Sequence, residues 1–131
     1  MPGVDDNVEV VRLLWSAVRR DDIDAIVGTT AADVGWRPTA VVRPRLHGHD
    51  ELRAYLAELY AGGRLADAHP FSFEALGDCV IVSGVLLVRH DPQRVTTMQR
   101  WWVYRVRDGK IATAGSHLNR GEAVLDARRR G

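Results

Sequence analysis

The stretch from Met98 to Asn119 constrains the fold more than any other part of this 131-residue chain. Its first arm, residues 98–107, alternates between two faces, one of which carries Met98, Arg100, Trp102, Tyr104 and Val106. A repeat of two residues is typical of a β-strand. Asp108-Gly109 follows as a tight-turn dipeptide. The stretch therefore predicts a β-hairpin, and strict alternation in its second arm would put His117 on the same inward face as Ile111.

Helices are predicted in the first half of the chain. Apolar residues recur at helical spacing over residues 6–20, 22–27 and 51–60. Asp6, Asp22 and Asp50 stand at the starts of these segments, where a side-chain oxygen can accept from the free backbone N–H groups, so we expect them to be caps.

Strands are predicted over 34–38, 71–74 and 80–88 and in the two arms of the hairpin, with one or two helical turns over 120–128. Helices that precede a run of consecutive strands indicate an α+β domain with a mostly antiparallel sheet. Such a sheet must curl around the helices to cover them, which leaves a cavity. We expect one domain, 1–131, with flexible ends at 1–5 and 128–131.

Composition excludes several classes of partner. The net charge of +1 gives no field that would attract nucleic acid. The first residues have no signal-peptide pattern, and no apolar run reaches the roughly 18 residues of a membrane helix. The single Cys79 fits a reducing compartment, so we expect a cytoplasmic protein with a buried thiol. His47 and His49 lack a third ligand for zinc, and we expect no metal and no cofactor.

Three segments together resemble a known family. Residues 19–38, 47–59 and 101–124 are similar, in order and spacing, to motifs of the nuclear transport factor 2-like superfamily. The nearest branch is the SnoaL-like proteins, relatives of polyketide cyclases and ketosteroid isomerase. The resemblance implies a cone-shaped, cystatin-like roll: a curled, mostly antiparallel sheet packed on three helices of the N-terminal half. It says little about chemistry, because this fold hosts many functions.

The departures from that family are informative. Ketosteroid isomerases use a tyrosine and two aspartates for catalysis. At the positions that match these three in the family motifs, this chain carries Leu14, Arg37 and Trp102. The base and an oxyanion donor are thus missing, so that isomerase chemistry is not expected. The carboxylate that relatives place near the end of the last strand is replaced by Asn119, which cannot act as a general base.

His117 and Arg100 are the candidate catalytic residues. A histidine moves protons near neutral pH, and an inward arginine holds a carboxylate or stabilises an enolate. Each residue also has a structural interpretation: His117 as a hydrogen-bonded histidine in a cavity wall, and Arg100 as an arginine paired with Asp33 or Glu74. No carboxylate lies near His117 on its own strand, so we expect it to stay neutral and to hydrogen bond a ligand.

Two functions therefore stay open. The first is an isomerase-, cyclase- or lyase-type enzyme acting on a small apolar cyclic substrate by proton transfer. The second is a protein that binds a lipophilic or aromatic molecule without chemistry. Arg100 and His117 in one cavity would favour the enzyme. The expected ligand-binding residues, some of which plain core packing would explain equally well, are Leu14, Trp36, Arg37, Tyr55, Leu59, Met98, Trp102, Tyr104 and Asn119.

The opposite face of the hairpin is also apolar. It carries Trp101 and Val103, which cannot reach the helices that cover Trp102 and Tyr104. A sheet with two apolar faces needs cover on both. We therefore expect a homodimer formed through this outer face.

Overall fold

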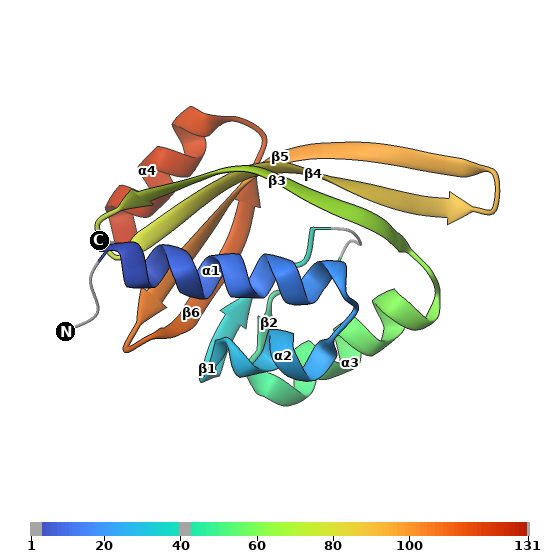
Figure 1. Ribbon diagram of the computed structural model, residues 1–131, viewed down its shortest axis with the longest axis horizontal. Helices are drawn as coiled ribbons and strands as arrows, with labels where there is room; N and C mark the ends of the chain where they lie inside the picture. Colours follow the sequence, from blue (N-terminus) through green and yellow to red (C-terminus); the bar gives the residue numbers. More distant parts are fainter. Residues whose placement is uncertain (1–3, 40–42, 131) are drawn as a thin grey trace.

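The computed structural model describes residues 4–39 and 43–130 (Figure 1). Its elements are α1 (Val4–Arg19), α2 (Ile23–Gly28), β1 (Thr30–Trp36), β2 (Leu46–His47), α3 (Gly48–Ala61), β3 (Leu65–Leu76), β4 (Cys79–Asp91), β5 (Arg94–Arg107), β6 (Lys110–His117) and α4 (Arg120–Arg130). The predicted order of helices followed by consecutive strands is confirmed. Among the described residues, no helix is both long enough and apolar enough to cross a membrane.

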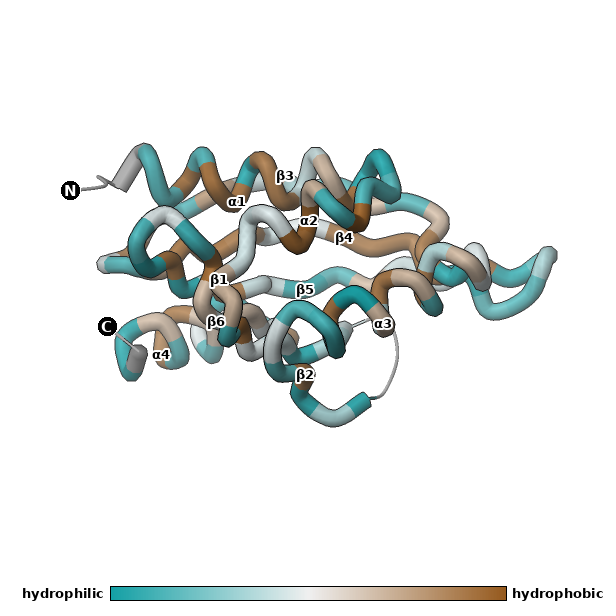
Figure 2. The backbone as a smooth tube through the Cα atoms, turned by 90° about the horizontal axis from the view of Figure 1, so that it is seen from below, coloured by the Kyte–Doolittle hydropathy of each residue, from teal (hydrophilic) through white to brown (hydrophobic). Residues whose placement is uncertain are grey.

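The strands form one open sheet in the order β2-β1-β6-β5-β4-β3. Neighbouring strands are antiparallel except β1 and β6, which run parallel. This confirms the predicted α+β class with a mostly antiparallel sheet. Figures 1 and 2 show α1 on one side of the sheet and α4 on the other. The long β4–β5 hairpin extends beyond the helices and ends in a hydrophilic tip (Figure 2).

Each face of the sheet has its own core. We call the face that bears Trp102 and Tyr104 the inner face and the one that bears Trp101 and Val103 the outer face. The inner core packs on α1, α2 and α3 and includes Val11, Leu14, Trp15, Ile26, Val34, Leu52, Leu56, Val80, Val82, Trp102, Tyr104 and Ile111. The outer core lies beneath α4 and consists of Cys79, Ile81, Val103, Ala123 and Ala127, with Trp101 packed against it.

This second core changes the argument for a dimer. Val103 is only 1% exposed because α4 covers it. The idea that only a second chain could cover this face is therefore wrong, since α4 of the same chain buries Val103 and packs against part of Trp101. The homodimer itself stays a prediction.

One extra residue in β6 reverses the predicted sidedness of its end. Val106 pairs with Ile111, but Arg105 pairs with Thr113, so Ala112 is a β-bulge. Beyond a one-residue bulge, every side chain moves to the other face. Consequently Ser116, opposite Trp102, faces inward, and His117, opposite Trp101, faces outward. The prediction that His117 shares the face of Ile111 is wrong for this reason.

The helix starts were predicted correctly only in part. Asp22 caps α2 by accepting from the backbone N–H of Ala25 at 3.1 Å, as predicted. Asp6 lies within α1, and α3 begins at Gly48, so Asp50 belongs to its first turn. Of the ends predicted to be flexible, residues 4–5 belong to α1 and residues 128–130 to α4, and their flexibility stays a prediction. Residues 1–3 and 131 lie outside the described part.

Gly84 is a position where the sheet tolerates no side chain. A Cβ atom there would lie 2.5 Å from the carbonyl oxygen of His69 and 3.0 Å from Cα of Pro70. Both are backbone atoms of β3, next to the irregular pairing between Pro70 and Ser72, so they cannot rotate away. We expect Gly84→Ala to lower the free energy of unfolding by about 1–3 kcal/mol, measured by urea denaturation. Gly28→Ala is the control, because a Cβ there meets nothing within 4 Å; an equal loss in both variants would contradict this.

Candidate functional site

The inner face holds an aromatic cavity with a volume of about 60 Å³. Its lining comes from α1, α3, the inner side of the sheet and the loop after β1, namely Trp15, Val18, Trp36, Thr39, Tyr55, Leu56, Leu59, Tyr60, Leu65, Leu86, Trp102 and Tyr104. Five of the expected ligand-binding residues are among them: Trp36, Tyr55, Leu59, Trp102 and Tyr104. We call this space the inner cavity.

Ring contacts hold the walls of the inner cavity. The ring centroids of Trp15 and Trp102 lie 4.9 Å apart with the planes at 75°, an edge-to-face arrangement that joins α1 to β5. Trp36 on β1 and Tyr104 on β5 are tilted, with centroids 6.4 Å apart. Leu14, on the same helix as Trp15, is 0% exposed in the core and does not line the cavity. Leu14 is therefore a packing residue, contrary to its expected place in a binding site.

The few polar groups of the inner cavity are neutral. Trp102 Nε1 donates to Thr39 Oγ1 at 3.1 Å, and the Thr39 hydroxyl donates to Ser116 Oγ at 3.2 Å. Tyr60 donates to the carbonyl oxygen of Val18 at 3.1 Å. None of the described residues that line the cavity carries a formal charge. A hydrogen-bonded chain therefore ends at the cavity without providing an ionised acid or base there.

Trp15 Nε1 differs from the hydrogen-bonded polar groups described above. It is buried and has no hydrogen-bond acceptor among the described residues. A weak hydrogen-bonding interaction with the Tyr104 hydroxyl lowers the pKa of that phenol against the larger effect of burial, but the contact falls short of ordinary hydrogen-bond geometry. A buried N–H without a partner is rare in native proteins and costs free energy. An acceptor on a bound molecule would remove that cost.

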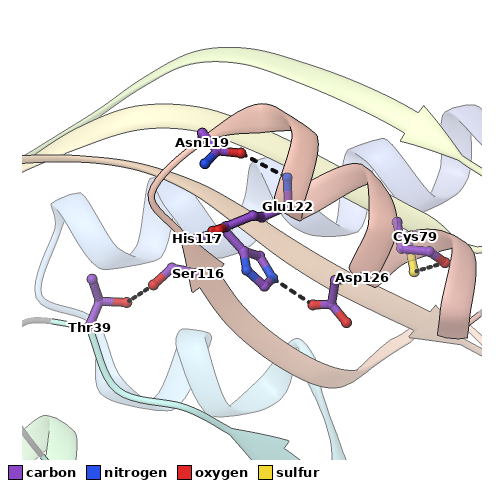
Figure 3. Close-up of polar contacts among 8 residues, drawn as sticks. Thr39, Cys79, Ser116, His117, Asn119, Glu122 and Asp126 are labelled. Atoms are coloured by element: carbon purple, nitrogen blue, oxygen red, sulfur yellow. Dashed lines mark hydrogen bonds and ion pairs between the residues drawn. The ribbon is translucent and has the colours of Figure 1, made fainter.

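The outer face holds a second space, a polar groove of about 370 Å³. It is lined by Arg37, His117, Glu122, Leu125, Asp126 and Arg129, and we call it the outer groove. His117 Nε2 lies 2.8 Å from Asp126 Oδ2 of α4 (Figure 3). Because an ionised carboxylate only accepts, Nε2 donates and Nδ1 is left for another partner. The expectation that no carboxylate lies near His117 is thus wrong, so the argument for a neutral imidazole that rested on it no longer holds, and the partner is neither Asp33 nor Glu74.

The remaining candidates are spread over the molecule. Arg100 pairs with Gly84 in the sheet, donates to the carbonyl oxygen of Gln99 at 2.7 Å, and lines neither the inner cavity nor the outer groove. Arg100 and His117 therefore do not share a cavity. Met98 packs against the inner core. Asn119 caps α4 by accepting from the backbone N–H of Glu122 at 2.9 Å, as Figure 3 shows.

His47 ends β2, and His49 lies in the first turn of α3. His49 Nε2 lies 3.2 Å from the carbonyl oxygen of Thr30. Among residues 4–39 and 43–130, no group of three or more His, Cys, Asp or Glu side chains could hold a metal ion.

Sequence reasoning missed Trp15, Thr39 and Asp126 as site residues. Trp15 follows the core residue Leu14 on the apolar face of α1, so the helical pattern alone does not separate it from the core. Asp126 lies on α4 between Arg120 and the basic run 128–130, and only the docking of α4 reveals its role. A retrospective signal exists for Asn119, because Asn119 followed three positions later by Glu122 fits the start of a helix.

Comparison with known proteins gives a consistent family. The sequence profile of the SnoaL-like domain matches residues 11–114. A crystal structure of an NTF2-like protein of unknown function from Burkholderia pseudomallei is similar, with 25% identity, 92% of this chain and 95% of that chain covered, and a TM-score of 0.75. TerC, co-crystallised with polyporic acid, shows 22% identity, coverage of 94% and 98%, and a TM-score of 0.75.

A third similar structure is an uncharacterised cystatin-fold protein from Novosphingobium aromaticivorans. It shows 17% identity, coverage of 85% of this chain and 97% of that chain, and a TM-score of 0.72. No curated protein matches the chain significantly. These likenesses confirm the predicted NTF2-like, cystatin-like fold.

Burial of Tyr104 has a consequence for stability at high pH. Desolvation raises the pKa of the Tyr104 phenol well above its ordinary value of 10.0. Above about pH 10 the unfolded chain ionises at this residue and the folded chain does not, so the unfolded state binds fewer protons and stability falls. We expect the urea concentration at the unfolding midpoint to decrease as the pH is raised from about 9 to about 11. The decrease should be smaller in Tyr104→Phe. Equal slopes in the two proteins would contradict this assignment.

Proposed function

The chain belongs to the SnoaL-like domain family, and we propose that it binds a small, mainly apolar organic molecule in the inner cavity without chemical conversion. The observation that carries this proposal is an apolar, aromatic-walled space with one buried N–H donor, that of Trp15, which lacks an acceptor. Ligand sites are mostly apolar, with a small number of placed polar groups that orient the ligand. The ligand chemistry that fits is an aromatic or alicyclic ring bearing one acceptor oxygen.

The size of the cavity limits how much of the ligand is enclosed. Its volume of about 60 Å³ is smaller than the roughly 150 Å³ of an apolar cavity that takes benzene. The half-buried side chains Trp36, Thr39 and Tyr60 form part of its wall. A ring-sized ligand would therefore insert its oxygen-bearing end towards Trp15 and keep the rest against these half-buried groups. TerC, which shares the fold, was crystallised with an organic molecule, polyporic acid.

The enzyme alternative has less support. It required Arg100 and His117 to act on one substrate, whereas the two residues lie on opposite faces of the sheet. The tyrosines of the inner cavity are poor bases, because burial raises the pKa of both Tyr60 and Tyr104 and keeps the phenols neutral. A neutral phenol and an indole N–H donate hydrogen bonds to a bound oxygen, which is what a binding site requires.

The binding proposal predicts a preference for a ketone over its hydrocarbon isostere. Acetophenone and α-methylstyrene have nearly the same shape, but only acetophenone offers an acceptor to Trp15. We expect acetophenone to bind with a dissociation constant of about 1 mM, as ligands of this size typically do. It should bind about tenfold more tightly than α-methylstyrene. The measurement is an NMR titration that follows the indole N–H signals.

Two variants and a control sharpen this test. Trp15→Phe removes the donor and keeps a ring, so it should abolish the preference. Leu86→Phe fills the cavity from its wall and should weaken both ligands, whereas Leu125→Phe, at a residue 53% exposed on α4, should change neither. Absence of binding by both ligands would sink the proposal.

We further propose a homodimer through the part of the outer face that α4 leaves uncovered. Val85, Leu87 and Trp101 are half-buried there, and Val95 is 44% exposed. Apolar sheet surface of this kind is commonly covered by a self-complementary contact.

The dimer predicts a mass of twice the chain by light scattering at micromolar concentration. Leu87→Glu should reduce it to the monomer mass, because a carboxylate would be buried unpaired in the contact. Ala57→Glu, at an exposed position of α3, is the control and should leave the mass unchanged. A wild-type monomer would refute the dimer without affecting ligand binding.

A further inference from the structure

We infer that the outer groove binds a small oxyanion, a carboxylate or a phosphate group, at a site separate from the inner cavity. The groove brings together three side chains that can donate to such a group, Arg37, His117 and Arg129. They come from the ends of β1 and β6 and from α4, so the site exists only in the folded domain.

The backbone directs Arg37 into the groove. Its N–H donates to the carbonyl oxygen of Ala114 at 2.9 Å, which continues the parallel pairing of β1 with β6. Trp36 faces the inner cavity, and the next residue, Arg37, leaves from the outer face. Its Cβ lies 4.0 Å from where a Cβ of Gly115 would be, on the side of the sheet where His117 follows two residues later.

The two arginines of the groove share it with Glu122 and Asp126 but are not paired with either carboxylate. Neither Arg37 nor Arg129 forms a salt bridge with another residue in the described part of the chain. Several other arginines are paired, among them Arg105 with Asp78 at 3.2 Å and Arg107 with Asp33 at 3.3 Å. A guanidinium with free donors suits the planar, two-oxygen edge of a carboxylate or phosphate.

His117 is held ready for a ligand by Asp126. The His117 and Asp126 side chains are 22% and 19% exposed, so the pair is largely withdrawn from water but remains open to the groove. Because Nε2 is engaged by Asp126, the ring is oriented and Nδ1 is the nitrogen available to a bound group. In the imidazolium form, Nδ1–H would donate to an oxyanion, and Asp126 would balance the charge.

The charges that line the groove set the class of ligand. Two guanidinium groups face the carboxylates of Glu122 and Asp126, and Asp126 is already engaged by His117. Protonation of His117 leaves one net positive charge, which matches one anionic group. Leu125, 53% exposed, adds an apolar wall. The volume of about 370 Å³ lies within the range of small-molecule sites, so a small organic carboxylate or a phosphate monoester fits best.

The test is an NMR titration of the ¹⁵N-labelled protein in which sodium chloride is replaced by sodium acetate or sodium phosphate at constant ionic strength. We expect saturable shifts of the amides around Arg37, His117 and Arg129. Saturation by acetate alone or by phosphate alone would support the site and identify its ligand class. Arg37→Gln and Arg129→Gln should each weaken binding about tenfold.

Arg128→Gln is the matched control. Arg128 is exposed on the same helix and outside the groove, so its loss changes the net charge equally without touching the site. We expect it to bind the anion like the wild type, and all three variants to unfold at the wild-type temperature. Shifts that rise linearly without saturation, or an equal loss of affinity in Arg128→Gln, would overturn the proposal. Leu86→Phe, which fills the inner cavity, should leave anion binding unchanged.

Discussion

The pairing of β5 with β4 on one side and β6 on the other is the constraint on which the whole structure depends. It places Trp102 between Val82 and Ser116 on the inner face, and Trp101 between Ser83 and His117 on the outer face. Because adjacent residues of a strand point to opposite faces, these two tryptophans belong to different cores. The inner one contacts Trp15 of α1, and the outer one packs beside α4. The inner cavity and the outer groove follow from the same alternation.

The helices cover the two faces of the sheet with side chains of different size. The N-terminal ones close the inner face with large side chains, which meet imperfectly around Trp15 and Tyr104 and leave the cavity. By contrast, α4 lies on the outer face through Ala123 and Ala127, whose small side chains allow a close approach to Cys79 and Val103. The polar side of α4 then carries Asp126 to His117. One helix therefore both completes a core and builds one wall of a polar groove.

Most of the fold could be predicted from the sequence, because it follows from local patterns. The alternation from Met98 to Val106, the turn at Asp108-Gly109 and the helical spacing in the first half are properties of short segments. The inner-facing positions of Trp102 and Tyr104 followed from the same alternation, since β5 pairs regularly with β4 across both residues. The place of His117 was not predictable, because it depends on a bulge at Ala112 that only pairing with β5 reveals. The contact with Asp126 is equally non-local, since it needs the docked position of α4.

The bulge at Ala112 also means that the character of each face depends on the pairing of β6 as well as on its composition. If β6 kept all its residues but paired with β5 without the bulge, Ser116 would lie opposite Trp101 and His117 opposite Arg100. The imidazole would then face the inner side of the sheet, and the outer groove would lose it. Deletion of Ala112 has the contrary effect: the strand becomes regular, and Ser116 and His117 keep their partners Trp102 and Trp101. A relative with one residue fewer at this point can therefore present the same side chains on the same faces, although the sequence spacing between Ile111 and His117 differs.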